Sequence, residues 1–348
     1  MSLSNPSQVL LRNSELLTSA TPLLINLPED GFIDELITLN ESAKVSCYNT
    51  NFIDHQALTH KHGSRIHNNF TCVYESELQH DLVIIAFPKS KAELNFTLAM
   101  IAPFLTAETK ILIVGEKKGG IQSTPKLTAN FLEHCQKVDS ARHCFLFAGL
   151  MNENKRSVPF KLESWYKHYA ITVDGIELAI ASLPGVFSQE KLDIGTALLL
   201  SNLPKELTGK ILDFGCGAGV ISCFIAKKYS NVELSLLDVS ALALASAEKT
   251  LALNNINATV FPSNSLSEVT NTYQHIVSNP PFHQGVNTNY QATETFLSGI
   301  HKNLKKKGSI TIVANSFLRY QPIMEQYIGC TSVITKAQGF TIYHASKR

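Results

Sequence analysis

The chain has 348 residues, of which 44% are hydrophobic and 17% are charged, and its formal net charge at pH 7 is +1. This composition is ordinary for a globular protein, and the length predicts about two domains. The near-zero charge excludes a uniformly basic chain, so any surface that binds a polyanion must be local.

The cysteines and histidines show no pattern of a disulfide framework or a metal site. There are seven cysteines, an odd number without a C-x-x-C pair, and the twelve histidines lack metal-ligand spacing. No apolar run approaches transmembrane length, and the polar start does not resemble a signal peptide. We therefore expect a cytoplasmic protein with no metal and no membrane partner.

Two strand patterns flank a helical pattern in the N-terminal half. Residues 81–87 form an apolar run that ends before Pro88, an amphipathic stretch extends to Leu105, and a second apolar run covers residues 110–116. Residues 151–160 are polar and contain a proline, which is typical of a linker. The expected domains are therefore residues 1–155 and residues 156–348.

A glycine-rich run follows the first strand pattern of the C-terminal half. The run Asp213-Phe214-Gly215-Cys216-Gly217-Ala218-Gly219 joins a strand pattern over residues 210–213 to helical spacing over residues 220–229. Such a turn lets backbone N–H groups approach a small anion at a helix N-terminus. Val220 stands where a dinucleotide-binding loop needs its third glycine, and Asp213 would repel a pyrophosphate but can pair with an amino group.

The loop therefore predicts S-adenosylmethionine (SAM) as the ligand, held by Asp213, Gly215, Gly217 and Gly219. Taken in isolation, the same residues also fit an ordinary glycine turn beside an acidic surface residue, without a bound ligand. Asp238 strengthens the SAM interpretation, because it follows the strand pattern over residues 232–237, where a carboxylate can accept both ribose hydroxyls. Asn264 follows the pattern over residues 258–261 and can reach the adenine.

The run Ser278-Asn279-Pro280-Pro281-Phe282 ends the fourth strand pattern, over residues 274–278. Prolines stop a strand, and their carbonyls stay free as acceptors. The side-chain oxygen of Asn279 and the carbonyl of Pro280 can hold the two N–H bonds of an exocyclic amine, and Phe282 offers a face for a base. Asn-Pro also occurs in ordinary turns. Downstream of a SAM loop, Asn279, Pro280 and Phe282 instead predict the catalytic residues of methyl transfer to a planar nitrogen.

Strand and helix patterns alternate through the C-terminal half. Besides the strands named above, residues 308–314 form a strand pattern, and helical patterns lie near residues 218–229, 240–253 and 290–304. Such alternation predicts a mostly parallel, doubly wound α/β sheet. Two last strand patterns, residues 331–335 and 340–344, predict a terminal β-hairpin, which is typical of SAM methyltransferases rather than nicotinamide enzymes.

The whole chain resembles the bacterial ribosomal RNA guanine-N2 methyltransferases of the methyltransferase small family. Besides the two motifs, the resemblance rests on residues 7–13, 137–142, 183–188, 192–196 and 312–317. It implies that the segment from Gly185 to Thr196 packs against the cofactor and that Phe187, Asp193 and Gly195 line the SAM pocket. The sequence alone fits a hairpin and a helix start in this segment equally well.

Residues 81–116 repeat the order of strand, proline, helix and strand found from Gln274 to Asn315. Ala86-Phe87-Pro88-Lys89 stands where Asn279-Pro280-Pro281-Phe282 stands, and no glycine loop of the Asp213 type precedes it. We therefore expect two doubly wound, methyltransferase-like (Rossmann-type) domains, of which the N-terminal one binds no cofactor. The resemblance implies that this domain supports folding or engages RNA, and two unrelated α/β domains are the alternative.

The expected function is SAM-dependent methylation of the exocyclic N2 of a guanine in 16S ribosomal RNA, within the small ribosomal subunit or an assembly particle, by a monomeric enzyme. Methylation of large-subunit RNA, of adenine N6 or of protein glutamine uses the same type of motif and stays open. A non-catalytic RNA-binding assembly module is a further alternative, against which the intact Asn279-Pro280-Pro281 run weighs.

Overall fold

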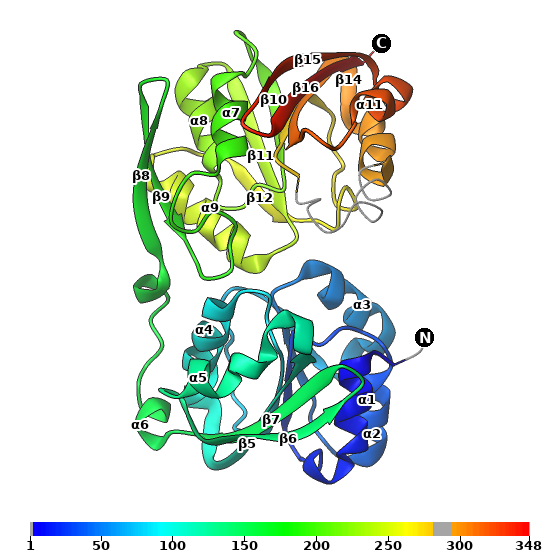
Figure 1. Cartoon of the computed structure of the whole chain (residues 1–348), viewed down its shortest axis with the longest axis vertical. Helices are drawn as coiled ribbons and strands as arrows, with labels where there is room; N and C mark the ends of the chain where they lie inside the picture. The colour runs from blue at the N-terminus through cyan, green and yellow to red at the C-terminus, as the bar shows by residue number, and fades with distance from the viewer. Residues whose placement is uncertain (1–2, 281–293, 348) are drawn as a thin grey trace. The chain divides into compact units, whose positions relative to one another are not determined.

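The computed structural model of the chain describes residues 3–280 and 294–347. The chain divides into two compact units, Met1–Trp165 and Tyr166–Arg348 (Figure 1). Each unit contains one seven-stranded sheet, and a separate two-stranded sheet opens the second unit. Within the described residues, every helix is too short or too polar to span a bilayer.

The N-terminal unit is built around seven strands. They are β1 (Pro22–Ile25), β2 (Ser46–Asn49), β3 (His67–Phe70), β4 (His80–Ala86), β5 (Leu105–Glu116), β6 (Leu132–Ala141) and β7 (Cys144–Met151). The helices are α1 (Asn5–Arg12), α2 (Phe32–Leu39), α3 (Phe52–His62), α4 (Lys91–Ile101), α5 (Thr124–Thr128) and α6 (Glu153–Arg156).

The C-terminal unit begins with the hairpin β8 (Lys167–Val173) and β9 (Ile176–Ser182). Its large sheet contains β10 (Gly209–Phe214), β11 (Val232–Asp238), β12 (Thr259–Pro262), β13 (Tyr273–Ser278), β14 (Leu304–Asn315), β15 (Gly329–Ala337) and β16 (Phe340–Lys347). The helices are α7 (Ile194–Ser201), α8 (Val220–Lys228), α9 (Ala241–Leu253) and α11 (Gln321–Tyr327), and residues 294–300 are also helical.

The two large sheets share one strand order. It is β3-β2-β1-β4-β5-β7-β6 in the first unit and β12-β11-β10-β13-β14-β16-β15 in the second. In each sheet the first five strands of this order run parallel, and the next strand is antiparallel to both of its neighbours. The predicted fold, two doubly wound α/β domains with a hairpin at the end of the C-terminal one, is confirmed.

Two hairpins were not predicted. β6 and β7 give the N-terminal sheet the same terminal hairpin as the C-terminal sheet, and β8 and β9 form the two-stranded sheet. The edge of β9 is covered by side chains of α9 and of its C-cap. The amide of Asn254, the C-cap, donates to the carbonyl of Ala179 at 2.7 Å, and Thr250 Oγ1 donates to the carbonyl of Ala181 at 3.1 Å. These bonds pair backbone groups that an open strand edge would leave exposed.

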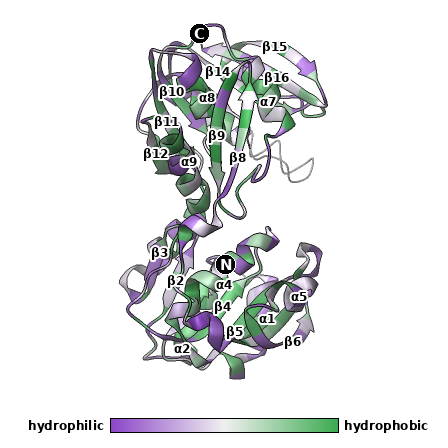
Figure 2. Ribbon diagram, turned by 90° about the vertical axis from the view of Figure 1, so that its left-hand side faces the viewer, coloured by the Kyte–Doolittle hydropathy of each residue, from purple (hydrophilic) through white to green (hydrophobic). Residues whose placement is uncertain are grey.

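Many residues of the strands and helices of both units are hydrophobic (Figure 2), and their side chains form buried clusters. In the C-terminal unit, Leu212 of β10, Ile276 of β13 and Ile312 of β14 form a buried cluster with Leu297 and Ile300. The neighbouring residues Ile211, Val277 and Val313 are buried as well, so both faces of these strands are covered, as is usual in parallel sheets.

Three of the predicted site residues lie at the strand ends where the strand order reverses. The chain leaves β10 through α8 and enters β11 on one side, whereas β13 pairs with β10 on the other side. In open α/β sheets, ligands bind outside the carboxyl ends of the strands at such a reversal. Asp213 lies near the end of β10, Asp238 ends β11, and Asn279 follows β13.

Candidate active site

The glycine loop joins β10 to α8 through three residues with positive φ. Gly215, Gly217 and Gly219 have φ values of 71°, 52° and 77°, which L side chains rarely adopt. A Cβ at Gly219 would lie 3.2 Å from Ala247 of α9, whereas a Cβ at Gly217 would meet nothing within 4 Å. The glycines therefore allow the chain to make this turn, and the space beside Gly217 is open.

Asp213 is fully buried beside the loop. Its Oδ2 accepts hydrogen bonds from Ser222 Oγ at 2.7 Å and from the Ser222 backbone N–H at 3.1 Å, while Oδ1 has no partner within the described residues. The pKa of Asp213 is raised to about 7, chiefly by burial and also by the charge of Asp238, against the effect of the Ser222 bonds. A buried carboxylate with an unpaired oxygen favours a cationic or N–H-donating ligand nearby.

Asp238 connects the loop to the next helix. Its Oδ2 accepts from the backbone N–H of Gly217 at 3.0 Å, and its Oδ1 accepts from the backbone N–H of Ser240 at 2.9 Å. Burial raises the pKa of Asp238, although the N–H groups of Ser240, Gly217 and Val239 lower it. Each carboxylate oxygen can accept about two hydrogen bonds. The arrangement can therefore accept two further donors, as a vicinal diol offers.

The amide of Asn279 is bound on its nitrogen side to the start of α7. Nδ2 donates to Asp193 Oδ2 at 3.1 Å and to Thr196 Oγ1 at 2.9 Å. Because an ionised carboxylate can only accept, the group facing Asp193 must be the nitrogen and not the oxygen of the amide. Oδ1 of Asn279 is consequently directed away from α7.

The backbone that precedes Asn279 is tied to β10. Ser278 is buried, and its hydroxyl donates to the carbonyl of Phe214 at 2.7 Å, which ties the end of β13 to the end of β10. Pro280 is buried and has no N–H to donate, but its carbonyl can accept. Phe282, the predicted stacking residue, lies outside the described residues.

The other predicted site residues lie around α7 and after β12. Asp193 is the N-cap of α7, and its Oδ2 accepts from the Thr196 backbone N–H at 2.9 Å. Gly195 is buried, and a Cβ there would lie 2.9 Å from the ring of Phe340, so the start of α7 packs closely on β16. Phe187 is half exposed, and Asn264 is exposed in the loop after β12.

Thr196 and Ser222 contact predicted site residues, although the sequence analysis gave them no individual role. The spacing Asp193-x-x-Thr196 is typical of a helix N-cap and could have placed both residues at one helix start. No local pattern indicates that Thr196 reaches Asn279, which is 83 residues away.

Three side chains of the N-terminal unit, Glu29, Asp34 and His62, lie close enough together to resemble a set of metal ligands. Lys61 Nζ lies 2.6 Å from Glu29 Oε1 and 2.7 Å from Asp34 Oδ2, and His62 Nε2 lies 2.6 Å from Glu29 Oε2. The lysine ammonium group already supplies positive charge between the two carboxylates. We interpret this cluster as an ion-pair network.

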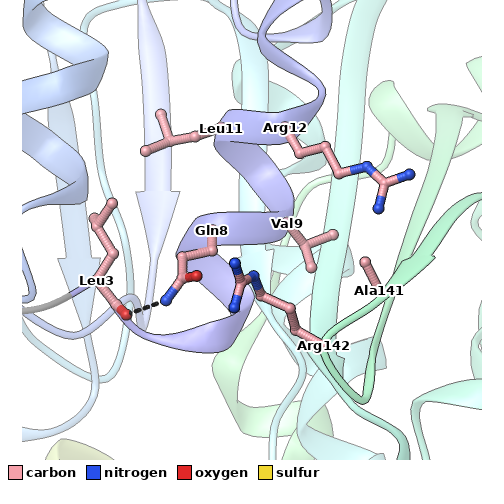
Figure 3. Close-up of a pocket in the computed structure, with 7 residues that line it drawn as sticks. All are labelled: Leu3, Gln8, Val9, Leu11, Arg12, Ala141 and Arg142. Carbon is pink, nitrogen blue, oxygen red and sulfur yellow. Dashed lines mark hydrogen bonds between the residues drawn. The ribbon is translucent and has the colours of Figure 1, made fainter.

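A hollow of about 690 Å³ lies in the N-terminal unit, between α1 and the turn of the β6–β7 hairpin (Figure 3). Its lining residues are Leu3, Gln8, Val9, Leu11, Arg12, Ala141 and Arg142. The side chain of Gln8 donates to the Leu3 carbonyl at 2.7 Å, and Arg12 pairs with Asp139 at 3.5 Å. None of the predicted site residues belongs to this hollow, so the candidate active site is defined by the glycine loop and Asn279.

The site offers acceptors and acids rather than a nucleophile. The amide oxygen of Asn279 and the carbonyl of Pro280 can accept hydrogen bonds, and Asp213 and Asp238 can hold donors or a cation. Burial raises the pKa of the Cys216 thiol well above its usual value, so this cysteine of the loop stays protonated and unreactive. Transfer of an electrophilic group to a bound amine suits this set of side chains.

Family models match both units of the chain. The model described as "Methyltransferase small domain" matches residues 177–344, and "Methyltransferase small domain N-terminal" matches residues 7–169. A ribosomal RNA small subunit methyltransferase C of Colwellia psychrerythraea is 66% identical over 350 aligned residues, which cover 99% of this chain and 98% of the relative. The chain belongs to the ribosomal RNA small subunit methyltransferase C family.

More distant relatives agree with membership of the methyltransferase C family. A protein of the same name from Vibrio vulnificus is 40% identical, with 98% of each chain covered. A solved structure of a T. thermophilus 16S rRNA N2 methyltransferase in complex with AdoMet and guanosine has a TM-score of 0.81. It covers 94% of this chain and 88% of its own, at 23% identity, and so supports the fold.

Proposed function

We propose that this chain is a SAM-dependent methyltransferase that modifies the exocyclic N2 of a guanine in 16S ribosomal RNA. The observation that carries the proposal is the amide of Asn279, whose nitrogen is bound to two side chains of α7, so that its oxygen remains for an exocyclic amine. Membership of the methyltransferase C family supports ribosomal RNA as the substrate. The name of the T. thermophilus neighbour supports guanine N2 as the acceptor atom.

The glycine loop, Asp213 and Asp238 would hold SAM. The unpaired oxygen of Asp213 fits the ammonium group of the methionine part, and the N–H groups of Gly215, Gly217 and Gly219 fit its carboxylate. Asp238 would accept the ribose hydroxyls, and Asn264 would lie beside the adenine. The family resemblance adds Phe187, Asp193 and Gly195 to the pocket. When bound, SAM supplies a methyl group on a sulfonium, with a neutral thioether as the leaving group.

Asn279 and Pro280 would make the guanine amine reactive. The lone pair of an exocyclic amine is delocalised into the ring, so the amine is a poor nucleophile. Two acceptors on its N–H bonds favour a pyramidal nitrogen whose lone pair points out of the ring plane. Phe282 would stack on the base. No side chain needs to remove the proton first, because the leaving group is neutral and the proton can leave after methyl transfer.

The N-terminal unit would bind no SAM, because the register of its sheet places other residue types at the key positions. Ile25, the last residue of β1, pairs with Tyr48 and Ile85. Phe214, the last residue of β10, pairs with Leu237 in the corresponding way. Matching the two sheets by this register puts Leu24, Asn49 and Ala86 where the C-terminal unit has Asp213, Asp238 and Asn279. None of the three carries a carboxylate, and Ala86 has no amide.

We propose the domain roles accordingly: residues 1–155 as a degenerate domain that supports folding or engages RNA, and residues 156–348 as the catalytic domain. The substrate would be the small ribosomal subunit or an assembly particle, and the enzyme would be a cytoplasmic monomer. Methylation of large-subunit RNA, of adenine N6 or of protein glutamine, and a non-catalytic assembly role, are the alternatives.

The test is a map of modified nucleosides in ribosomal RNA from a strain that lacks the gene. We expect one N2-methylguanosine to disappear from 16S RNA and to return when the intact gene, but not the Asn279→Ala variant, is restored. An unchanged 16S map with a lost modification in large-subunit RNA or in protein would contradict the proposal.

A further inference from the structure

The start of α7 binds the side-chain nitrogen of Asn279. One acceptor is Asp193 Oδ2 at 3.1 Å, and the other is Thr196 Oγ1 at 2.9 Å. A primary amide has two N–H donors. Because the nitrogen faces these two acceptors, the oxygen is the polar atom of the Asn279 side chain that remains for a substrate.

This arrangement is built into the fold. Asp193 has extended backbone geometry (φ −68°, ψ 143°) and caps α7 through the Thr196 N–H at 2.9 Å, and the Thr196 hydroxyl donates to the same oxygen at 3.4 Å. Thr196 is only 6% exposed. The neighbouring Gly195 lets the helix start pack on the Phe340 ring of β16. The acceptors of the Asn279 amide are thus fixed to the sheet that carries Asn279.

We propose that Asp193 and Thr196 are positioning residues that lock Asn279 as a hydrogen-bond acceptor and so select an amine as the group to be methylated. This inference rests on the proposed function and assigns the specificity of its acceptor step. An Asn side chain that could rotate by 180° about its last bond would present either an oxygen or an NH₂ group to a base. The carboxylate of Asp193 forbids the second orientation, because it would face the amide oxygen.

The fixed orientation of the Asn279 amide decides which groups of a substrate can bind to it. A base edge with a carbonyl oxygen at this position would meet the lone pairs of Asn279 Oδ1 and be rejected, whereas an exocyclic amine finds an acceptor. A hydrogen bond from Nδ2 to an ionised carboxylate also polarises the amide and strengthens its oxygen as an acceptor. Asp193 therefore acts on the reaction through Asn279.

The first experiment compares Asp193→Ser and Thr196→Val with the unchanged protein. The serine can still cap α7 but is too short to reach Asn279, and the valine keeps the shape of threonine without its hydroxyl. We expect kcat on small-subunit particles to fall by about tenfold to a hundredfold, as for other misplaced reacting groups. The SAM affinity of Thr196→Val should stay within about twofold by calorimetry, and Asp193→Asn, which keeps an acceptor oxygen, should retain most of the activity.

A matched control separates positioning from helix capping. Asn51 caps α3 in the N-terminal unit and accepts from the Ile53 N–H at 2.8 Å. Asn51→Ala should lower thermal stability as a lost cap does and leave kcat unchanged. If Asp193→Ser and Thr196→Val keep full kcat, or if the SAM affinity of Thr196→Val falls in step with its kcat, the positioning role is refuted.

The double variant distinguishes a failure of this inference from a failure of the proposed function. In single-turnover assays at high enzyme concentration, Asp193→Ser should cause no further loss when added to Asn279→Ala, because both changes remove one interaction. A loss of the same factor in both backgrounds would refute the lock while leaving the role of Asn279 intact. Full activity of Asn279→Ala alone would refute the proposed function instead.

Discussion

The carboxylate of Asp238 and the backbone of Gly217 are joined by a hydrogen bond of 3.0 Å between Oδ2 and the amide nitrogen. Asp238 ends β11, and Gly217 is the middle glycine of the loop that follows β10. One carboxylate therefore fixes the turn of the glycine loop, and in the proposed function it would also accept the ribose hydroxyls of SAM.

Replacement of Asp238 by alanine should weaken SAM binding while the fold stays intact. The lost charge-assisted hydrogen bonds are worth about 1.5 to 3 kcal/mol, so calorimetry should show a Kd about tenfold to a hundredfold higher. Glu233→Ala is the control, because Glu233 lies on the same strand and its exposed side chain forms an ion pair with Lys210 at the surface. Equal SAM affinity in the two variants would contradict the role of Asp238.

The affinity for SAM should fall as the pH is lowered from 7.5 to 6. Burial holds the pKa of Asp213 at about 7 in the free protein, and a cationic ligand favours the ionised carboxylate. Below that pKa, binding must release a proton from Asp213, so Kd should rise by up to about tenfold per pH unit. The amino group of free SAM stays mostly protonated in this range. The Asp213→Asn variant should bind more weakly and show a flat profile, and an equally steep profile in that variant would contradict the assignment.

Local patterns in the sequence were sufficient to place the predicted cofactor residues at one edge of a sheet. Asp213 and the glycines lie within seven consecutive residues, and Asp238 follows the next strand, so strand, turn and helix signals place all of them at one edge of a sheet. The apolar runs in the sequence likewise predicted the positions of the central strands, because buried parallel strands are continuously apolar.

The amine side of the site depends on contacts that no local pattern contains. Asp193 lies 86 residues from Asn279, and their contact requires β13 to pair with β10 and α7 to pack on β14 and β16. The hairpin β8–β9 escaped prediction because β8 is largely exposed and its sheet has only two strands. Strand β6 escaped for a similar reason, since its residues are mostly exposed and its pairing with β7 is interrupted by bulges.

Fragments that contain one unit each should differ in their binding of SAM. The fragment 1–165 is preferable to one that ends at residue 155, because Trp165 packs against Phe96, with ring centroids 5.5 Å apart. We expect the fragment 166–348 to bind SAM in calorimetry and the fragment 1–165 to bind none. Detectable SAM binding by 1–165 would overturn the inference drawn from Leu24, Asn49 and Ala86.

Replacement of Asn279 by alanine should separate binding from chemistry. The SAM affinity should remain, because the predicted contacts of SAM lie on the other strands, while turnover should fall by roughly 10² or more, as when one preorganised polar group is removed from a transition-state site. Stopped assays with labelled SAM give the rate, and calorimetry gives the affinity. Turnover near the original rate would show that Asn279 is not the acceptor.

The central claim is that the amine selected by the locked amide of Asn279 is N2 of a guanine in 16S ribosomal RNA. Its most direct test incubates the purified protein with methyl-labelled SAM and small ribosomal subunits from a strain that lacks the gene, followed by digestion to nucleosides and amino acids. The label should appear in N2-methylguanosine from 16S RNA, and the Asn279→Ala variant should transfer almost none. Label in N6-methyladenosine or in protein glutamine would contradict the assignment.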